Sequence, residues 1–200
     1  MVSRAFRELP ELGYHIPGPR RGPSIVIQEI QLQGIIRAVL GGYVLAPRGI
    51  HGLGHWARVL ECGLRLADKT GADVRIVRLF AVLHDSRREN EGTDAGHGRR
   101  GAEFAAGLRN SLFVLDDPDF ERLIFACDHH TDTDFHPDPT IQTCWDADRL
   151  DLPRVFTKVD PAFLGTAAAR DPGMIRWAGE RSRNGIVPRY VETDWDPPAG

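Results

Sequence analysis

Histidine and aspartate are concentrated in the middle of this 200-residue chain. Seven of its 8 histidines lie between His51 and His136, and ten of its aspartates lie between Asp116 and Asp151. Imidazole and carboxylate groups together are the ligands that hold metal ions in hydrolytic sites. The clustering therefore indicates metal-assisted hydrolysis as the chemistry that this chain could perform.

The spacing of these residues places several of them on the apolar faces of helices. Steps of three and four residues put side chains on one face of an α-helix. By this rule His55, His84, His97, His130 and Asp148 each extend an apolar stripe, on five separate segments. A single buried histidine is more often a hydrogen-bonded core residue, but burying several imidazoles and carboxylates is costly unless something binds them. A divalent metal is the partner that such a convergent set favours.

Some of these residues also form an ordered motif. His55, the dipeptide His84-Asp85, and Asp148 follow one another along the chain, and an apolar run from Phe80 leads into the dipeptide. Asp148 stands within the segment Ala-Asp-Arg-Leu-Asp. This pattern resembles the H…HD…D signature of the HD-domain superfamily of metal-dependent phosphohydrolases, over about residues 50–155.

The resemblance implies an all-α fold, a bundle of about six to eight helices around the metal. It implies that His55, His84, Asp85 and Asp148 ligate a divalent cation, with Asp85 bridging where two ions are bound. The implied reaction is hydrolysis of a phosphate ester, because a metal lowers the pKa of bound water and neutralises phosphoryl charge. Mn, Fe, Co, Ni, Mg and Zn all remain candidates for the ion.

Additional histidines extend this minimal motif and bear on whether one ion or two are bound. His51 lies one helical turn before His55, and His97 and His130 lie between the HD pair and the final aspartate. Family members with two or three ions, including those that hydrolyse cyclic dinucleotides, add histidines in this interval. The interval from Asp85 to His97 is short for that branch and its GYP loop is missing, which argues against cyclic-dinucleotide hydrolysis.

Several assignments keep an alternative. His97 fits a metal ligand as well as a phosphate contact or a helix cap, and His130 fits a ligand of metal or of phosphate. Asp146 competes with Asp148, but its place on the helix favours an indirect role, orienting a ligand from behind. The residues expected to lie outside the ligand set are His15, His129, His136 and Asp94, the last as a helix N-cap.

Basic residues flank the same motifs and could bind phosphate through forked guanidinium hydrogen bonds. Arg149 directly follows Asp148, and we expect it to be catalytic together with Asp85 and His130. Lys158 is a weaker candidate, and Asn90 is expected to shape the loop after the HD pair. The other candidates for a phosphate-binding rim flank the HD pair and His97: Arg87, Arg88, Arg99 and Arg100.

Helices must position these residues, and the apolar periodicity predicts them. Few stretches alternate with period two, so the predicted class is all-α. The expected helices span residues 28–44, 52–69, 73–84, 97–109, 118–130, 139–152 and 161–184, the last interrupted at Pro172-Gly173. Residues 1–24, rich in proline and glycine, are expected to form an N-terminal arm, residues 25–188 the helical domain, and residues 189–200 a C-terminal tail.

Composition limits the partners. The net charge of −3 argues against extended nucleic acid. The 3 cysteines contain no close pair, which argues against a disulfide framework or zinc finger and favours a reducing compartment. The chain shows no apolar run of membrane-spanning length and no hydrophobic N-terminal signal, so we expect a cytoplasmic protein without a membrane partner.

These observations predict a metal-dependent phosphohydrolase, a phosphomonoesterase or phosphodiesterase that uses metal-activated water. Its expected partner is a small, nucleotide-like phosphorylated substrate, and its expected cofactor is one or two divalent ions. Two alternatives stay open: a di-iron oxygenase of the same fold, and a non-catalytic module that binds a nucleotide. The oxygenase would use six ligands: His55, His84, Asp85, His97, His130 and Asp148.

Overall fold

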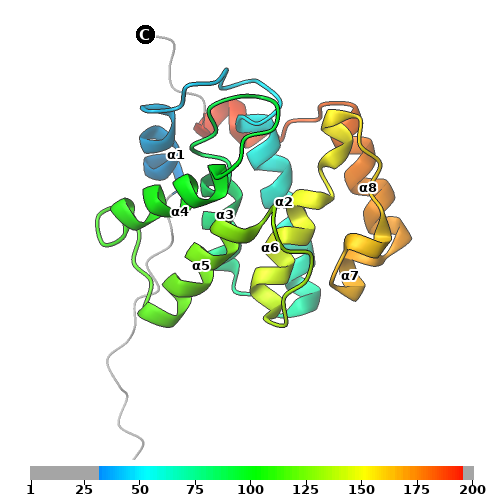
Figure 1. Ribbon diagram of the computed structural model, residues 1–200. Helices are drawn as coiled ribbons and strands as arrows, with labels where there is room; N and C mark the ends of the chain where they lie inside the picture. Colours follow the sequence, from blue (N-terminus) through cyan, green and yellow to red (C-terminus); the bar gives the residue numbers. More distant parts are fainter. Residues whose placement is uncertain (1–31, 196–200) are drawn as a thin grey trace, which may run out of the picture.

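The computed structural model describes residues 32–195, and helices are the only regular secondary structure within that range (Figure 1). This confirms the predicted all-α class. The arm expected at residues 1–24 lies outside the described residues. None of the helices between residues 32 and 195 combines the length and the apolar character that crossing a membrane requires.

The helices follow the predicted order along the chain. The α-helices are α1 (Leu32–Leu40), α2 (Leu53–Thr70), α3 (Val74–Leu83), α4 (His97–Leu108), α5 (Asp117–His129), α6 (Pro139–Arg149), α7 (Ala167–Arg170) and α8 (Pro172–Arg183). Two 3-10 turns, η1 (Leu152–Val155) and η2 (Pro161–Phe163), and a short π-helix, η3 (Val191–Trp195), complete the set.

Aspartates begin several of these helices. Asp73 caps α3, as expected, by accepting a hydrogen bond from the backbone N–H of Arg75. Asp116, Asp138 and Asp171 cap α5, α6 and α8 in the same way. Such a side chain satisfies backbone N–H groups that have no partner within the helix. Part of the aspartate surplus therefore starts helices and does not bind a ligand.

Helix α2 runs through the middle of the bundle and packs against α3, α6 and α8, while α4 and α5 pair at one side (Figure 1). The apolar stripes meet in the interior, where Trp56, Phe80 and Trp145 are buried. Burial of this apolar surface is the main stabilising contribution of the core. It also fixes the helix ends that carry the candidate ligands.

The last predicted helix, residues 161–184, is wrong in its first half. Residues 164–166 connect η2 to α7 without regular structure, because the Asp146 carboxylate accepts hydrogen bonds from the backbone N–H groups of Gly165 and Thr166. Pro172 begins α8 and does not interrupt a longer helix, since Asp171 caps it there. The predicted tail overlaps η3, whose Val191 and Trp195 are buried.

Two glycines let α4 approach its neighbours closely. A Cβ at Gly98 would lie 2.5 Å from the carbonyl oxygen of Cys127, and a Cβ at Gly101 would lie 2.6 Å from the carbonyl oxygen of Leu83. Both distances are shorter than van der Waals contact, so only glycine allows this packing. The close approach brings His97, the first residue of α4, up to the ends of α3 and α5.

We expect Gly101→Ala to lower the free energy of unfolding by about 1–3 kcal/mol, since a methyl group there forces α4 away from α3. Gly107→Ala in the same helix is the matched control, because a Cβ at Gly107 meets nothing within 4 Å. The control should raise stability by about 0.5–1 kcal/mol through helix propensity. Urea denaturation of both variants measures the difference, and equal effects would contradict the close packing.

Candidate metal centre

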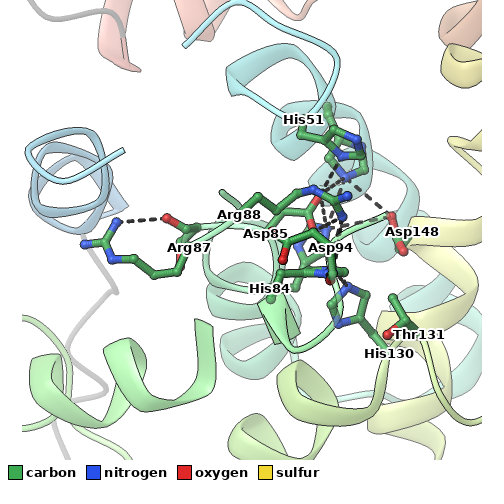
Figure 2. Close-up of polar contacts among 12 residues, drawn as sticks. His51, His84, Asp85, Arg87, Arg88, Asp94, His130, Thr131 and Asp148 are labelled. Atoms are coloured by element: carbon green, nitrogen blue, oxygen red, sulfur yellow. Dashed lines mark hydrogen bonds and ion pairs between the residues drawn. The ribbon is translucent and has the colours of Figure 1, made fainter. Parts of the chain in front are cut away.

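The predicted ligands stand at helix ends that meet at one end of the bundle. His55 lies in the first turn of α2, and His84 and His130 follow the last residues of α3 and α5. His97 begins α4, and Asp148 lies in the last turn of α6. Figure 2 shows side chains of this set pointing toward one another around Asp85. The structure therefore brings together all the residues that the apolar stripes singled out.

Four histidines of the cluster are oriented in the same way. Each Nδ1 lies 2.7–3.0 Å from an oxygen that can only accept: Asp151 Oδ2 for His55, and the carbonyl oxygens of Phe80, Asp94 and Cys127 for His84, His97 and His130, respectively. A carbonyl oxygen has no proton, so Nδ1 must be the donor. In the neutral form of each ring, Nε2 then carries the lone pair, and it faces the centre, as it does in histidines that bind metals.

These inward lone pairs meet in two close pairs. His55 Nε2 lies 3.0 Å from His84 Nε2, and His97 Nε2 lies 2.9 Å from His130 Nε2. Two acceptors at that distance repel unless a proton or a cation lies between them or beside them. Adjacent ligands of an octahedral ion with bonds near 2.1 Å are about 3.0 Å apart, so the pairs have the spacing of metal ligands.

Asp85 lies between the two pairs and offers one oxygen to each. Its Oδ2 is 3.5 Å from His55 Nε2 and 3.9 Å from His84 Nε2. Its Oδ1 is 3.1 Å from His97 Nε2 and 3.7 Å from His130 Nε2. A carboxylate in this position could contribute a ligand atom to a metal ion at either pair.

Asp148 adds a carboxylate oxygen to the His55–His84 pair. Its Oδ1 lies 3.4 Å from His55 Nε2 and 3.7 Å from His84 Nε2, and this buried atom has no hydrogen-bond partner among residues 32–195. A buried oxygen without a partner is costly unless a cation occupies the space beside it. The donor atoms form three overlapping groups suited to a metal: His55/His84/Asp85, His84/His130/Asp148 and Asp85/His97/His130.

The electrostatic setting favours the metal-binding forms of His55, Asp85 and Asp148, whereas the neighbouring carboxylates of Asp85 and Asp148 outweigh burial and raise the pKa of His84. Burial, reinforced by Arg154, lowers the pKa of His55 to about 4, so this imidazole is neutral at pH 7. Burial alone would raise the pKa of Asp85 and of Asp148, but the surrounding imidazoles outweigh it and hold both pKa values well below their usual range. Neutral imidazole and ionised carboxylate are the species that ligate divalent ions.

His51 occupies a different position from the other histidines. Its Nδ1 lies 2.9 Å from Asp85 Oδ2, and its Nε2 lies 3.9 Å from Glu91 Oε2. It belongs to none of the donor groups in the described part of the chain. Its backbone carbonyl accepts a hydrogen bond from the Tyr43 hydroxyl. The structure thus gives His51 the role of a donor that fixes the Asp85 carboxylate, and direct ligation by His51 stays a prediction.

The arginine predicted to be catalytic lies elsewhere. Arg149 donates to the backbone carbonyls of Thr133, Asp134 and Phe163 and contacts no member of the cluster. Successive residues of an α-helix point about 100° apart, and this rotation directs Arg149 toward the 133–134 loop, away from the ligands. The side chain of Arg149 therefore holds two loops together and does not reach the centre.

Among the other predicted arginines, only Arg88 reaches the cluster. Its Nη1 lies 3.2 Å from His97 Nε2 and 3.5 Å from Asp85 Oδ1. Arg87 points away from the centre (Figure 2). Its guanidinium covers the ring of Phe104. Arg99 pairs with Glu103, and Arg100 pairs with Asp94.

Arg154, which the sequence analysis missed, provides a second cation at the centre. Its Nη1 lies 3.9 Å from Asp148 Oδ1 and its Nη2 lies 3.5 Å from His51 Nδ1. Hydrogen bonds to the carbonyl oxygens of Ile50 and Asp151 fix the side chain. Arg88 and Arg154 thus approach different parts of the cluster, one beside His97 and the other beside Asp148.

Asp151, and not Asp146, supports a ligand from behind. Asp151 accepts from His55 Nδ1 at 2.8 Å and from the Arg58 guanidinium at 2.7 and 3.0 Å. Asp146 is fully buried, but its carboxylate binds Gln142, Gly165 and Thr166. The indirect role predicted for Asp146 is therefore wrong, because that side chain lies on another face of α6.

We expect Asp151→Asn to weaken metal binding by about 10- to 100-fold, the usual effect of changing a group that orients a histidine ligand. The amide can turn its NH₂ toward His55 or Arg58, which disrupts the fixed tautomer of the imidazole. Competition with a chromophoric chelator measures the affinity. The control is Asp160→Asn, which replaces an exposed carboxylate that caps η2. Equal affinities in the two variants would contradict the role given to Asp151.

The remaining predicted residues lie around the centre or away from it. Asp94 does not cap α4, whose N-cap is Gly96. Instead, Asp94 pairs with Arg100 and offers its carbonyl to His97. Asn90 shapes its loop by accepting from the backbone N–H of Gly92. His129 and His136 both pack against the ring of Phe125 at tilted angles, outside the cluster.

Comparison of the chain with protein-family models, with curated proteins and with solved structures finds no match.

Proposed function

We propose that this protein is a metal-dependent phosphohydrolase of the HD type, with two divalent ions that share Asp85. The observation that carries the proposal is the position of Asp85, which presents one carboxylate oxygen to the His55–His84 pair and the other to the His97–His130 pair. A buried carboxylate between two sets of free imidazole lone pairs is an arrangement suited to a dinuclear centre.

The charge of the centre supports an anionic substrate. Asp85 and Asp148 supply the carboxylates, which offset only half the charge of two divalent ions, and the Asp151 carboxylate is already paired with Arg58. Arg88 and Arg154 add further positive charge beside the ligands. Guanidinium groups bind phosphate oxygens through forked hydrogen bonds, so a phosphate group fits this excess positive charge.

The residues of the chain have separable roles in the proposed reaction. A divalent metal, when bound, lowers the pKa of a coordinated water toward neutrality and offsets charge on the phosphoryl oxygens. His51 donates to Asp85 and fixes the shared carboxylate. Arg88 and Arg154 would hold the phosphate group from two parts of the cluster, and the buried setting strengthens these contacts because charges interact more strongly in a low dielectric.

The test combines metal analysis with a substrate panel. Protein purified without chelator is analysed for bound metals and then assayed with Mn²⁺, Fe²⁺, Co²⁺, Ni²⁺, Mg²⁺ or Zn²⁺. The substrates are p-nitrophenyl phosphate, bis(p-nitrophenyl) phosphate and nucleoside mono-, di- and triphosphates. We expect two equivalents of metal and phosphate-ester hydrolysis that EDTA abolishes. Absence of bound metal, or hydrolysis that survives chelation, would contradict the proposal.

A di-iron oxygenase is the second candidate, and the ligand count favours it. The donor set contains six residues, His55, His84, Asp85, His97, His130 and Asp148, which is enough for two irons with open positions. Two tightly bound irons together with substrate-dependent oxygen uptake, and no phosphate-ester hydrolysis with any metal, would establish this reading in place of the first.

A further inference from the structure

We propose that a groove between η1 and α8 binds a small anion with an aromatic body, such as a nucleoside phosphate, at a site separate from the metal centre. The groove has a volume of about 390 Å³, within the range of small-molecule sites. Its floor and walls include Pro153, Val159, Ile175 and Gly179. An apolar cavity of this size suits a planar or aliphatic body.

The rim of the groove carries positive charge that no carboxylate of residues 32–195 balances. Lys158, Arg176 and Arg183 line it, and their side chains make no hydrogen bond or ion pair with any residue between 32 and 195. Arg181 on the same helix is different, because it is paired with Glu61. Cations gathered around an apolar groove without a carboxylate partner complement a ligand that is apolar in its body and anionic at its edge.

Phe156 adds an aromatic surface at the same place. It is 101% exposed and has a φ of 61°, in the left-handed region that side chains rarely adopt. Such a conformation costs free energy in a residue other than glycine, and here it forms the C-cap that ends η1. An exposed ring held in this way at the edge of a groove can stack on an aromatic ligand.

The groove and the metal centre have no lining residue in common, but both are bordered by η1. No residue of the three donor groups lines the groove. Within η1 and its C-cap, Pro153 and Phe156 line the groove, whereas Arg154 reaches toward Asp148 and His51. Binding of an anion in the groove therefore does not require metal.

The experiment uses the full chain in EDTA, so that metal-dependent binding of phosphate is removed. The probe is trinitrophenyl-AMP, followed by its fluorescence, with AMP and adenosine as competitors. We expect saturable binding in EDTA that AMP displaces and adenosine displaces at least about tenfold less well, because only AMP carries the anion. Binding that depends on metal, or equal displacement by the two competitors, would overturn the proposal.

Variants locate the binding in the groove. Arg176→Glu and Phe156→Ala should each weaken AMP binding by about tenfold, through charge and through stacking respectively. Arg99→Glu is the matched control, since this exposed arginine pairs with Glu103 in the same helix and does not line the groove. All three positions are exposed, so the fold should persist, which circular dichroism checks. The proposal is refuted if Arg99→Glu weakens binding as much as Arg176→Glu does. It is also refuted if the probe does not bind because another part of the chain or a second copy fills the groove.

Discussion

Asp85→Asn is expected to remove both metal ions and to lower kcat/KM for phosphate esters by about 10³-fold or more. Asparagine presents one acceptor oxygen and one NH₂ donor, so one pair of imidazoles would face a donor in place of a ligand. The substitution also removes the only carboxylate that faces both pairs within the described chain. Metal analysis of the purified variant and a phosphate-release assay measure the two effects.

Asp128→Asn is the matched control for this substitution. Asp128 lies near the end of α5, but its carboxylate is partly exposed and its one recorded contact within residues 32–195 is His129, at 3.9 Å. The control should keep its metal and its activity within about twofold, since an exposed ion pair contributes little. Retention of two equivalents of metal by Asp85→Asn would show that the centre is not assembled on this residue.

Much of the candidate site follows from helical spacing alone. Steps of three and four residues placed His55, His84, His97, His130 and Asp148 on apolar stripes, and the structure brings all five together. The reason is that the stripe defines the face that a helix buries, so a polar residue on it must point inward. Each of these residues also lies at or beside a helix end, where the stripe reaches one end of the core.

Being adjacent in sequence to a ligand predicts a role at the centre less well than helical spacing does. Arg149 was favoured because it follows Asp148, yet it binds loop carbonyls on another side of α6. Asp151 lies three residues after Asp148, and Arg154 lies three residues after Asp151. The same rule of three-residue steps, extended through η1, would have identified both.

Composition could not separate the roles of the aspartates. Asp116 and Asp138 cap helices, Asp146 anchors residues 165–166, and Asp119 pairs with Arg75. Each of these roles needs a carboxylate close to N–H groups. The number of aspartates in the sequence therefore does not show which of them cap helices, which anchor loops and which bind a metal. Three-dimensional position alone separates them, as the inward Oδ1 of Asp148 shows.

Arg154→Gln is expected to lower kcat/KM for phosphate esters by about 10²-fold while both metal ions remain bound. Its guanidinium lies beside Asp148, with Nη1 at 3.9 Å from Oδ1, but it is not one of the donor groups. Loss of one positioned donor to a developing phosphoryl charge typically costs this much. Lysine at this position should restore part of the rate, because it returns the charge without the fork. Steady-state kinetics with metal-loaded protein measures the change.

Arg149→Gln separates this role from a structural one, because Arg149 bonds loop carbonyls away from the cluster, whereas Arg154 also reaches Asp148 and His51. Arg149 supports three backbone carbonyls at distances of 2.5–2.9 Å, so its loss should lower the free energy of unfolding by about 1–3 kcal/mol. The kcat/KM of this variant should stay within about twofold of that of the unmodified protein, because Arg149 contacts none of the proposed metal ligands. If Arg149→Gln lost activity as Arg154→Gln does while its stability was unchanged, the phosphate group would lie on the side of α6 that faces the 133–134 loop, and the assignment of Arg154 would be wrong.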